Sequence, residues 1–344
     1  MRIAHVVWGM KTGGVETMLV NIINEQVKTE VVRLFIINDF VDGFIVDKIS
    51  SLCRIFKLNR KPGDKNPLKI VKLNYWLWIY SPDIIHVHSY QVSKLILGHW
   101  NIVRTIHGIN NISDEYPKMK ALYSISNAVK EFTTSQGFDS IVIPNGIKVN
   151  SMKCKDNVTT TANPFKIVQV SRLYVKDKGQ DILLKAIKFL VEQGLRNLTV
   201  SFIGTGSSEA QLIKMTKELC ISEHVVFEGL KSQEWLSEHL SDYDLFVQPS
   251  RCEGFGLTVA EAMAAKLPVL VSNIEGPMEI IGNGKYGMSF ESENVADLAD
   301  KLRIILQGGY DYSLIEKAYQ HVCDEYDVRN TARKYISEYK QIVQ

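Results

Sequence analysis

Residues 249–262 read Pro-Ser-Arg-Cys-Glu-Gly-Phe-Gly-Leu-Thr-Val-Ala-Glu-Ala. The apolar run before them, 245–248, is typical of a buried strand, and helical periodicity begins near Leu257. Glycines in the turn let the backbone approach a ligand closely. The free N–H groups at the start of the helix favour an anion such as a diphosphate. We therefore predict a strand, a glycine-rich turn that can bind phosphate, and a helix.

Two acids flank this turn, Glu253 in the loop and Glu261 in the helix, with seven residues between them. Carboxylates are good acceptors for pairs of hydroxyl groups such as those of a sugar or a ribose. Taken alone, the spacing also fits a strand–turn–helix whose glutamates are only solvated, and this is the more frequent case.

Strands and helices alternate along the rest of the chain. In the first half, runs rich in Val and Ile predict buried strands at 3–8, 32–37, 84–88 and 102–106, with helical spacing at 15–26. In the second half, the predicted strands are 165–170, 198–203, 225–228, 245–248 and 268–271, and the predicted helices are 179–193, 208–219, 235–240 and 257–265. Such alternation predicts an α/β protein with doubly wound parallel sheets, whose ligands bind beyond the carboxyl ends of the strands.

The chain has 344 residues, which favours two domains. A polar stretch without apolar periodicity separates the two halves. We predict an N-terminal Rossmann-like domain at 1–148, a linker at 149–164 and a C-terminal Rossmann-like domain at 165–327. The last helix, at about 328–344, is expected to pack back on the N-terminal domain.

Composition excludes several classes of protein. The formal net charge is only +2, so we expect no nucleic-acid partner. The five cysteines are scattered, which argues against a disulfide framework or a zinc site and favours a reducing cytoplasm. The chain opens on a predicted strand rather than a signal peptide, and no apolar run approaches the roughly 20 residues that span a bilayer.

Further motifs occur along the chain in a definite order. They are Gly13-Gly14-Val15-Glu16, Pro144-Asn145-Gly146-Ile147, Ser171-Arg172-Leu173 and Lys178-Gly179, followed by the two acids seven residues apart. Together they resemble the signatures of glycosyltransferase family 4, and the resemblance covers nearly the whole chain. It implies the GT-B fold, in which two Rossmann-like domains face a deep cleft. The bacterial members that make surface polysaccharides are the most similar type.

The resemblance also implies a donor site for a nucleotide-diphosphate sugar, UDP-linked in most members, with no metal and no further cofactor. Arg172 and Lys178 would neutralise the diphosphate, Glu253 would contact a donor-sugar hydroxyl, and Glu261 would hold the ribose diol. His107 would approach the reacting carbon, so the catalytic set is His107, Glu253, Arg172 and Lys178. The remaining donor-binding residues would be Gly13, Gly14, Gly204, Gly229, Leu230, Gly254, Phe255, Gly256 and Leu257.

The implied reaction is transfer of a hexose or N-acetylhexosamine with retention at the anomeric carbon. In this family the leaving phosphate oxygen is thought to accept the acceptor's proton on the same face of the sugar. The acceptor would be a glycan or an undecaprenyl-diphosphate-linked oligosaccharide, used for capsule, exopolysaccharide or O-antigen at the cytoplasmic face of the membrane. Two alternatives are a UDP-sugar 2-epimerase of the same fold and an inactive nucleotide-sugar-binding protein.

Other patterns have simpler interpretations. Asp242 and Asp244 have the D-x-D form of metal-dependent glycosyltransferases, but they precede a predicted strand and fit a helix–strand loop. Gly204-Thr205-Gly206 lacks the third glycine of a dinucleotide fingerprint. His86 and His88 share one face of a strand, and without a third visible ligand we expect packing or cleft-lining rather than zinc.

A basic and aromatic segment, Lys61–Tyr80, could contact an anionic membrane surface. The simpler interpretation is a crossover helix that buries Trp76 and Leu77 on the sheet and exposes its lysines, and we favour it for these two residues. The lysines of this segment fit both interpretations, so peripheral contact with a membrane remains an alternative for them.

Overall fold

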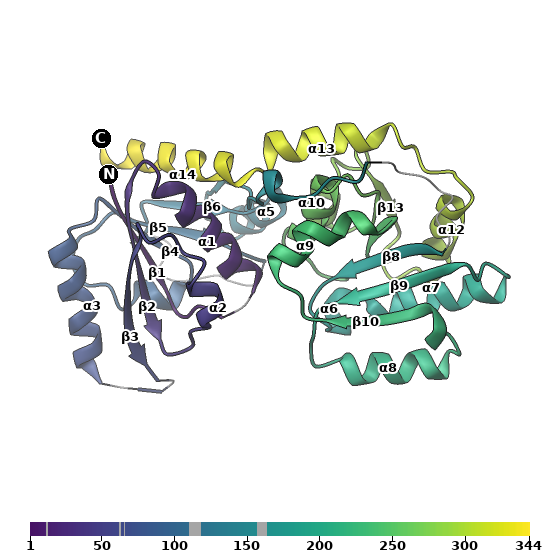
Figure 1. Cartoon of the computed structure of the whole chain (residues 1–344). Helices are drawn as coiled ribbons and strands as arrows, with labels where there is room; N and C mark the ends of the chain where they lie inside the picture. The colour runs from purple at the N-terminus through teal and green to yellow at the C-terminus, as the bar shows by residue number, and fades with distance from the viewer. Residues whose placement is uncertain (12, 62, 65, 110–117, 157–163) are drawn as a thin grey trace. The chain divides into compact units, whose positions relative to one another are not determined.

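The structure is a computed structural model that describes every residue except 12, 62, 65, 110–117 and 157–163 (Figure 1). It divides into two compact units. Unit 1 comprises Met1–Ile147 and Tyr326–Gln344, and unit 2 comprises Lys148–Glu325. These bounds lie within two residues of the domain limits predicted at 148 and 327.

Unit 1 contains a seven-stranded parallel sheet of order β3-β2-β1-β4-β5-β6-β7. Its strands are β1 (Arg2–Val7), β2 (Val31–Asn38), β3 (Arg54–Arg60), β4 (Ile84–Val87), β5 (Ile102–Ile106), β6 (Ala121–Ser124) and β7 (Ile141–Val142). Its helices are α1 (Gly14–Gln26), α2 (Gly43–Val46), α3 (Pro67–Tyr80), α4 (Tyr90–Ser93), α5 (Asn127–Ser135) and α14 (Val328–Val343). Strands β3, β6 and β7 were not predicted.

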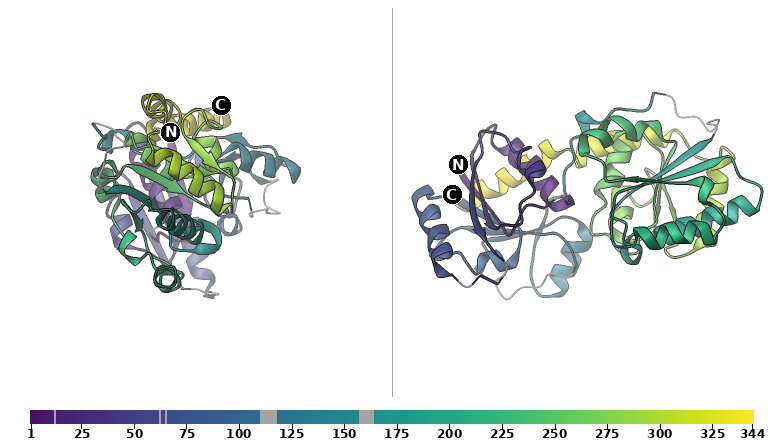
Figure 2. Two further views of the ribbon diagram at one scale, coloured as in Figure 1. Left: turned by 90° about the vertical axis from the view of Figure 1, so that its right-hand side faces the viewer. Right: turned by 60° about the horizontal axis from the view of Figure 1, so that its bottom comes forward.

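Successive residues of β1 point to opposite faces of this sheet, as the pleat requires. Ile3 packs in one core with Ile22 of α1 and Tyr335 of α14, whereas Ala4 packs in the other with Leu73 of α3. Helices therefore cover both faces of the sheet (Figures 1 and 2). The last helix belongs to unit 1, as the sequence predicted.

The turn that contains Gly146 explains how α14 is held on unit 1. A Cβ atom at Gly146 would overlap the backbone of Val328 and lie 2.5 Å from Thr331 Oγ1. Thr331 Oγ1 donates to the carbonyl oxygen of Pro144 at 3.0 Å, and the N–H of Val328 donates to the carbonyl of Ile147 at 2.9 Å. Glycine is needed here because the helix approaches the turn too closely for a side chain.

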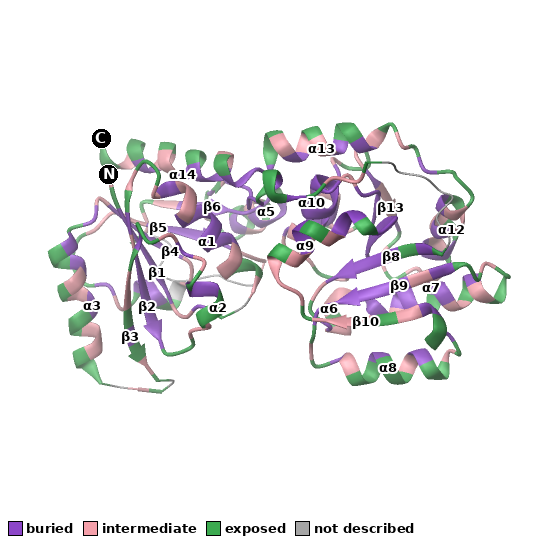
Figure 3. Ribbon diagram, in the orientation of Figure 1, coloured by how far each residue is buried: buried purple, intermediate pink, exposed green. Residues whose placement is uncertain are grey.

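Unit 2 contains a six-stranded parallel sheet of order β10-β9-β8-β11-β12-β13. Its strands are β8 (Phe165–Val170), β9 (Leu198–Ile203), β10 (Val225–Gly229), β11 (Leu245–Gln248), β12 (Val269–Ser272) and β13 (Met288–Phe290). Its helices are α6 (Val175–Lys178), α7 (Gln180–Glu192), α8 (Glu209–Glu218), α9 (Gln233–His239), α10 (Leu257–Ala264), α11 (Glu275–Ile280), α12 (Val295–Leu306) and α13 (Leu314–Glu325). Strands β8, β9, β11 and β12 form the buried centre of the unit, whereas the edge strand β10 is half-buried or exposed (Figure 3).

The segment predicted as a linker is partly integrated into unit 2. The N–H groups of Lys153 and Lys155 donate to the carbonyl oxygens of Ser237 and Ala265 at 2.8 and 2.9 Å. The Lys155 ammonium also lies 3.0 Å from Asp244 Oδ1. Although the polar composition predicted a linker, Lys153 and Lys155 are therefore attached to unit 2. Residues 157–163 of the predicted linker lie outside the described residues.

Candidate functional site

The strand order of unit 2 places two loops side by side. Strand β8 lies between β9 and β11, so the chain leaves β8 toward one side of the sheet and later returns to pair on the other. The loops that follow β8 and β11 therefore start side by side, at the carboxyl ends of two neighbouring strands, and lead to opposite halves of the sheet. This topological switch point is where ligands of doubly wound sheets bind.

The two loops are in direct contact. A Cβ atom at Gly179 would overlap the carbonyl oxygen of Pro249, and Gly179 has a φ of +63°, a region that favours glycine. The carbonyl oxygen of Asp177 accepts the N–H groups of Arg251 and Cys252 at 2.8 and 3.1 Å. Glycine and backbone hydrogen bonds thus hold the loop after β8 against the turn after β11.

This contact brings Lys178 to the acidic turn. Lys178 Nζ lies 2.5 Å from Glu253 Oε2, and the two side chains are only 17% and 21% exposed. Gln248 Nε2 donates to the same carboxylate oxygen at 3.0 Å, and Thr258 Oγ1 donates to Gln248 Oε1 at 3.0 Å. Two of the four residues predicted as catalytic are therefore neighbours, in a site where a cation is partly shielded from water.

Arg251 anchors this arrangement, a role that the motif alone did not reveal. Its guanidinium makes two parallel bonds with the carboxylate of Asp181, at 2.8 and 2.9 Å, and donates to the carbonyl oxygen of Val175 at 2.7 Å. It also donates to Glu293 at 2.8 Å. Bidentate pairs of this kind fix geometry as well as charge. Arg251 therefore ties the turn to α6 and α7.

Arg172 contacts a different acid from the one that Lys178 contacts. Its side chain is 66% exposed, and its Nη2 lies 3.7 Å from Asp177 Oδ2. The guanidinium carbon lies 5.2 Å from the centre of the Tyr174 ring. The structure thus gives Arg172 a place in the loop after β8, but the contact with the turn is made by Lys178.

Helix α10 begins directly from the glycine-rich turn. Gly256 is its N-cap, with a φ of +108°, and has no side chain with which to cap the helix. Phe255 is buried, and a Cβ atom at Gly276 would lie 2.6 Å from the carbonyl oxygen of Glu253 and 2.9 Å from the N–H of Phe255. The turn is therefore packed against Gly276 of α11, and it continues from Gly254 to Leu257, the first residue of α10.

Glu261 is the second acid of the motif and is almost completely buried in α10, with 7% exposure. Gln233 Nε2 donates to its Oε1 at 2.6 Å. Burial raises the pKa of Glu261 to about 7, although the bond from Gln233 opposes this shift. The carboxyl group is therefore poised between its neutral and charged forms at neutral pH.

The residues predicted near the base follow the next two strands. The N–H of Gly204, after β9, donates to the carbonyl of Gly229, at the end of β10, at 2.8 Å. Gly204 has a φ of +134°, and a Cβ atom there would overlap the carbonyl oxygen of Ser171. Leu230 is 64% exposed, and a Cβ atom at Gly229 would meet no atom of the described residues within 4 Å. These strand ends form an open shelf beside Ser171.

In unit 1, Gly13 is the N-cap of α1 and Gly14 is the first residue of the helix. Gly13 has an extended backbone, so its conformation does not require glycine. A Cβ atom there would lie 2.7 Å from Glu16 Oε2, the end of a flexible side chain that can move away, so the described contacts do not require glycine either. Burial raises the pKa of Glu16 above its ordinary value.

His107 follows β5 and belongs to a cluster of four histidines from neighbouring strands. His107 Nε2 lies 3.2 Å from His88 Nδ1, and His88 Nε2 lies 3.2 Å from His5 Nδ1. His86 bonds through its two nitrogens to Thr105, at 2.8 Å, and to the Tyr339 hydroxyl, at 2.5 Å. His5 was not predicted from the sequence. It lies in β1 opposite His86 of β4, so the pairing of these two strands is the signal that could have identified it.

Burial lowers the pKa of each of these histidines. The pKa values of His5 and His107 fall to about 4, and those of His86 and His88 fall well below the ordinary value. The cluster is therefore neutral at pH 7. His5, His86 and His88 are the one group of possible metal ligands found within the described residues, with nitrogens within 4.8 Å of one another. The D-x-D pair forms no such group there, since Asp244 pairs with Lys155 and Asp242 with His239.

Comparison with known proteins shows which family the sequence of this chain is similar to. A family model described as "Glycosyl transferases group 1" matches residues 154–321, which lie within unit 2. An uncharacterized glycosyltransferase of Methanocaldococcus jannaschii is 30% identical over 269 residues, which are 76% of this chain and 65% of that protein. Residues 154–321 are therefore similar to the group 1 glycosyltransferases.

Solved structures show that the chain has the GT-B fold. A glycosyltransferase of Rickettsia africae superposes with a TM-score of 0.82 at 21% identity, over 100% of this chain and 99% of that chain. HepE of Anabaena in complex with UDP superposes with a TM-score of 0.78 at 20% identity, over 99% and 100% of the two chains. The chain spans between 35% and 65% of the length of the first curated relatives that it matches.

Helix α3 has two apolar faces. Leu73 and Leu77 are buried on the sheet, and the half-buried ring of Trp76 is tilted against that of Phe56, with 5.1 Å between the ring centres. The structure therefore has the crossover-helix packing favoured for Trp76 and Leu77. The opposite face exposes large apolar side chains at helical spacing, namely Leu68, Val71, Tyr75, Trp78 and Ile79. We call these five residues the α3 stripe. None of the described helices is long and apolar enough to cross a membrane.

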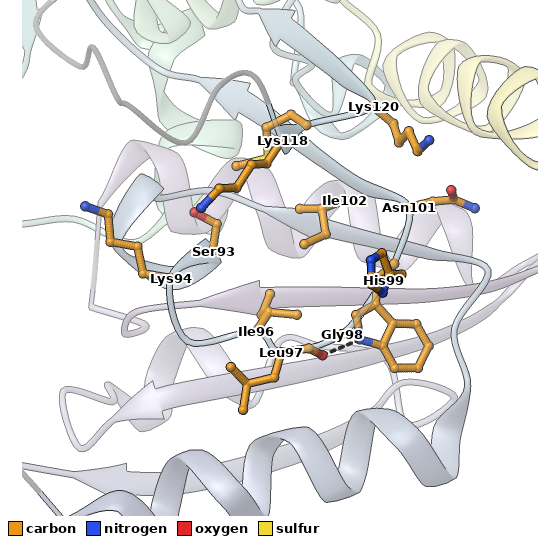
Figure 4. Close-up of a pocket in the computed structure, with 12 residues that line it drawn as sticks. Ser93, Lys94, Ile96, Leu97, Gly98, His99, Asn101, Ile102, Lys118 and Lys120 are labelled. Atoms are coloured by element: carbon orange, nitrogen blue, oxygen red, sulfur yellow. Dashed lines mark hydrogen bonds between the residues drawn. The ribbon is translucent and has the colours of Figure 1, made fainter.

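A pocket of about 890 Å³ lies beside α3, at the amino ends of β5 and β6 (Figure 4). Lys118 extends toward Ser93 at one end of it, where Lys94 also lies but points outward, and Lys120 lies toward the other end (Figure 4). The amide of Asn74 in α3 bonds to the backbone of Leu95 and Leu97, at 2.9 and 2.7 Å, and so connects this pocket to the α3 stripe. The pocket lies at the opposite edge of the sheet from His107.

Proposed function

We propose that this chain transfers a sugar from a nucleotide-diphosphate sugar and that unit 2 binds the donor at the loops after β8 and β11. The observation that carries the proposal is the contact between Lys178 and Glu253. It joins the two loops at the switch point of the sheet, beside the start of α10. A diphosphate needs positive charge at a place that the backbone can approach, and this is such a place.

Donor binding would exchange the partners of this ion pair. In the structure the Lys178 ammonium is neutralised by Glu253. A diphosphate beside the first turn of α10 would offer Lys178 a more highly charged partner. Glu253 would then be free to accept hydrogen bonds from hydroxyls of the donor sugar. Arg172, which is exposed in the same loop, would add a second positive charge.

Glu261 would hold the ribose of the nucleotide. Its burial and its pKa of about 7 mean that diol binding and ionisation would occur together, since two hydroxyl groups donate better to the charged form. Gly204, Gly229 and Leu230 would form the shelf for the base. UDP is the nucleotide that we favour, and HepE of Anabaena was solved with UDP.

The chemistry would be metal-independent transfer with retention. Lys178, Arg172 and the N–H groups at the start of α10 would stabilise the negative charge that develops on the leaving diphosphate. Preorganised charges of this kind usually make the largest contribution to catalysis. His107 would contact the donor sugar near the reacting carbon. The leaving phosphate oxygen would accept the proton from the acceptor on the same face of the sugar.

Unit 1 would bind the acceptor, for which we propose an undecaprenyl-diphosphate-linked oligosaccharide or a related surface glycan. Such an acceptor lies at the cytoplasmic face of a membrane, and we propose that the α3 stripe contacts that surface. Helix α3 contains no acidic residue but contains Lys69 and Lys72, and three more lysines line the adjoining pocket. An apolar face flanked by positive charge fits an anionic lipid surface.

The test is a screen of UDP, GDP and their common sugar conjugates by thermal shift, followed by product analysis. A donor should raise the melting temperature, because it binds the native state. With an acceptor, NMR of the product should show the anomeric configuration of the donor. An inverted product would refute the mechanism, and conversion of a UDP-sugar to its 2-epimer without acceptor would indicate the isomerase. Binding without turnover across many acceptors would indicate an inactive binding protein.

A further inference from the structure

A continuous chain of hydrogen bonds runs from His107 into the interior of unit 1. His107 Nε2 lies 3.2 Å from His88 Nδ1, and His88 Nε2 lies 3.2 Å from His5 Nδ1. His5 Nε2 lies 2.7 Å from Gln26 Oε1. His107 Nδ1 is buried and has no hydrogen-bond partner among the described residues. The chain therefore begins at the amide oxygen of Gln26 and ends at the buried Nδ1 of His107.

The inner end sets the direction of the protons. With its oxygen toward His5, Gln26 can only accept, so His5 carries its proton on Nε2 and leaves Nδ1 as an acceptor. His88 must then donate from Nε2 to His5, and His107 must donate from Nε2 to His88 Nδ1. A neutral imidazole carries one proton, so Nδ1 of His107 keeps a lone pair.

The surroundings keep all three rings neutral. Burial is the main cause of their lowered pKa values, and the positive charge of Arg104 further disfavours protonation of His88 and His107. The other titratable groups that pack on the cluster are His86, whose pKa is also lowered, and three tyrosines. Burial raises the pKa of each tyrosine, so these hydroxyls stay neutral as well, namely Tyr123, Tyr335 and Tyr339.

We infer that Gln26, His5 and His88 are positioning residues that fix His107 as the Nε2–H tautomer, so that its Nδ1 accepts a hydrogen bond from a substrate hydroxyl. The inference deepens the proposed function, on which it rests only for the source of that hydroxyl, a nucleotide sugar. The tautomer itself depends on the residues of unit 1 alone. An acceptor nitrogen selects a hydroxyl that can donate, and it disfavours a group that can only accept.

A bound metal would be the competing explanation for the cluster. The nitrogens of His5, His86 and His88 are close enough to share one cation. His86, however, already bonds through both nitrogens to Thr105 and Tyr339. Both ring nitrogens of His5 and of His88 likewise have hydrogen-bond partners in the chain, so none of the three rings needs a metal to satisfy its nitrogens.

The experiment is NMR of the full-length protein labelled with ¹⁵N-histidine, because long-range ¹H–¹⁵N correlations distinguish the two neutral tautomers directly. Wild type should show His107 as the neutral Nε2–H form at pH 7. Gln26→Met removes the inner acceptor and should give a mixture of His107 tautomers. Tyr335→Phe is the matched control, since it removes a buried bond of 2.8 Å to Thr105 in the same core but leaves the chain intact. It should give the wild-type signal.

Turnover provides the second readout. A half-and-half mixture halves the competent fraction and lowers kcat/KM about twofold, whereas complete inversion removes one hydrogen bond and lowers it about tenfold. If Q26M does not fold, His5→Phe tests the same link, because a phenyl ring fills the space of the imidazole but has no nitrogen to connect Gln26 with His88.

Three results would overturn the inference: an Nδ1–H tautomer in wild type, an unchanged His107 signal in both Q26M and H5F, or stoichiometric metal in the purified protein. Failure of the proposed function would look different. In that case the NMR result would stand, while no nucleotide sugar would raise the melting temperature.

Discussion

Replacing Gly179 with alanine tests whether the close contact of the two loops has the energetic importance that the structure gives it. The new Cβ atom would overlap the carbonyl oxygen of Pro249, and the residue would keep a φ of +63°. An L-residue in this left-handed region costs about 1 to 2 kcal/mol. Relief of the overlap requires the loops to separate, which would break the hydrogen bonds from Arg251 and Cys252 to Asp177. At about 1 kcal/mol each, the total loss is about 3 to 4 kcal/mol.

Unit 2 contains a matched control for this change. Gly194 also has a positive φ, of +87°, but no atom of the described residues lies within 4 Å of the place that a Cβ atom would take. Gly194→Ala should therefore cost only the backbone penalty of about 1 to 2 kcal/mol. The assay is urea unfolding of both variants, followed by UDP titration of each. The reasoning is refuted if Gly179→Ala is no less stable than Gly194→Ala, or if it binds UDP as tightly as the control does.

Two further predictions concern titration and the α3 stripe. Because burial raises the pKa of Glu261 to about 7, the folded chain holds a proton that the unfolded chain releases near pH 4.5. The contribution of this group to the free energy of unfolding should therefore decrease as pH rises from 4.5 to 7. The affinity for UDP should increase as pH rises through 7, because the charged carboxylate binds the ribose diol better. Glu261→Gln should abolish both effects in urea unfolding and calorimetry, and a flat wild-type profile would contradict the assignment. Trp78→Ser should weaken sedimentation with phosphatidylglycerol vesicles several-fold, whereas Leu52→Ser, which removes an equally exposed apolar side chain elsewhere in unit 1, should not; equal losses would argue against the stripe as the contact.

The sequence predicted well the elements whose local signals agree with their burial. Strand β11 (Leu245–Gln248) and the start of α10 at Leu257 lie where they were predicted, because a short apolar run ends in Pro249 and a glycine-rich turn. Strand β3 (Arg54–Arg60) was missed because it is an edge strand in which most side chains are exposed or half-buried. Strand β7 was missed because it has only two residues. Edge strands bury too few side chains to leave an apolar run.

Long-range pairing limited the prediction of the site in the same way. The motif identified Lys178 and Glu253 separately, but only the switch of strand order around β8 explains why they meet. Arg251 lies inside the most informative motif, yet its role depends on Asp181, which is 70 residues away along the chain. His5 was missed for the same reason, since its partners come from neighbouring strands.

The central claim is that Lys178 leaves Glu253 to bind the diphosphate of the donor. Calorimetric titration of UDP into wild type, Lys178→Met and Lys176→Met tests it most directly, since Lys176 is an exposed lysine in the same helical turn. A charge-assisted hydrogen bond contributes about 1.5 to 3 kcal/mol, so Lys178→Met should bind UDP about ten- to a hundredfold more weakly, while Lys176→Met should bind like wild type. Wild-type affinity in Lys178→Met would contradict the account.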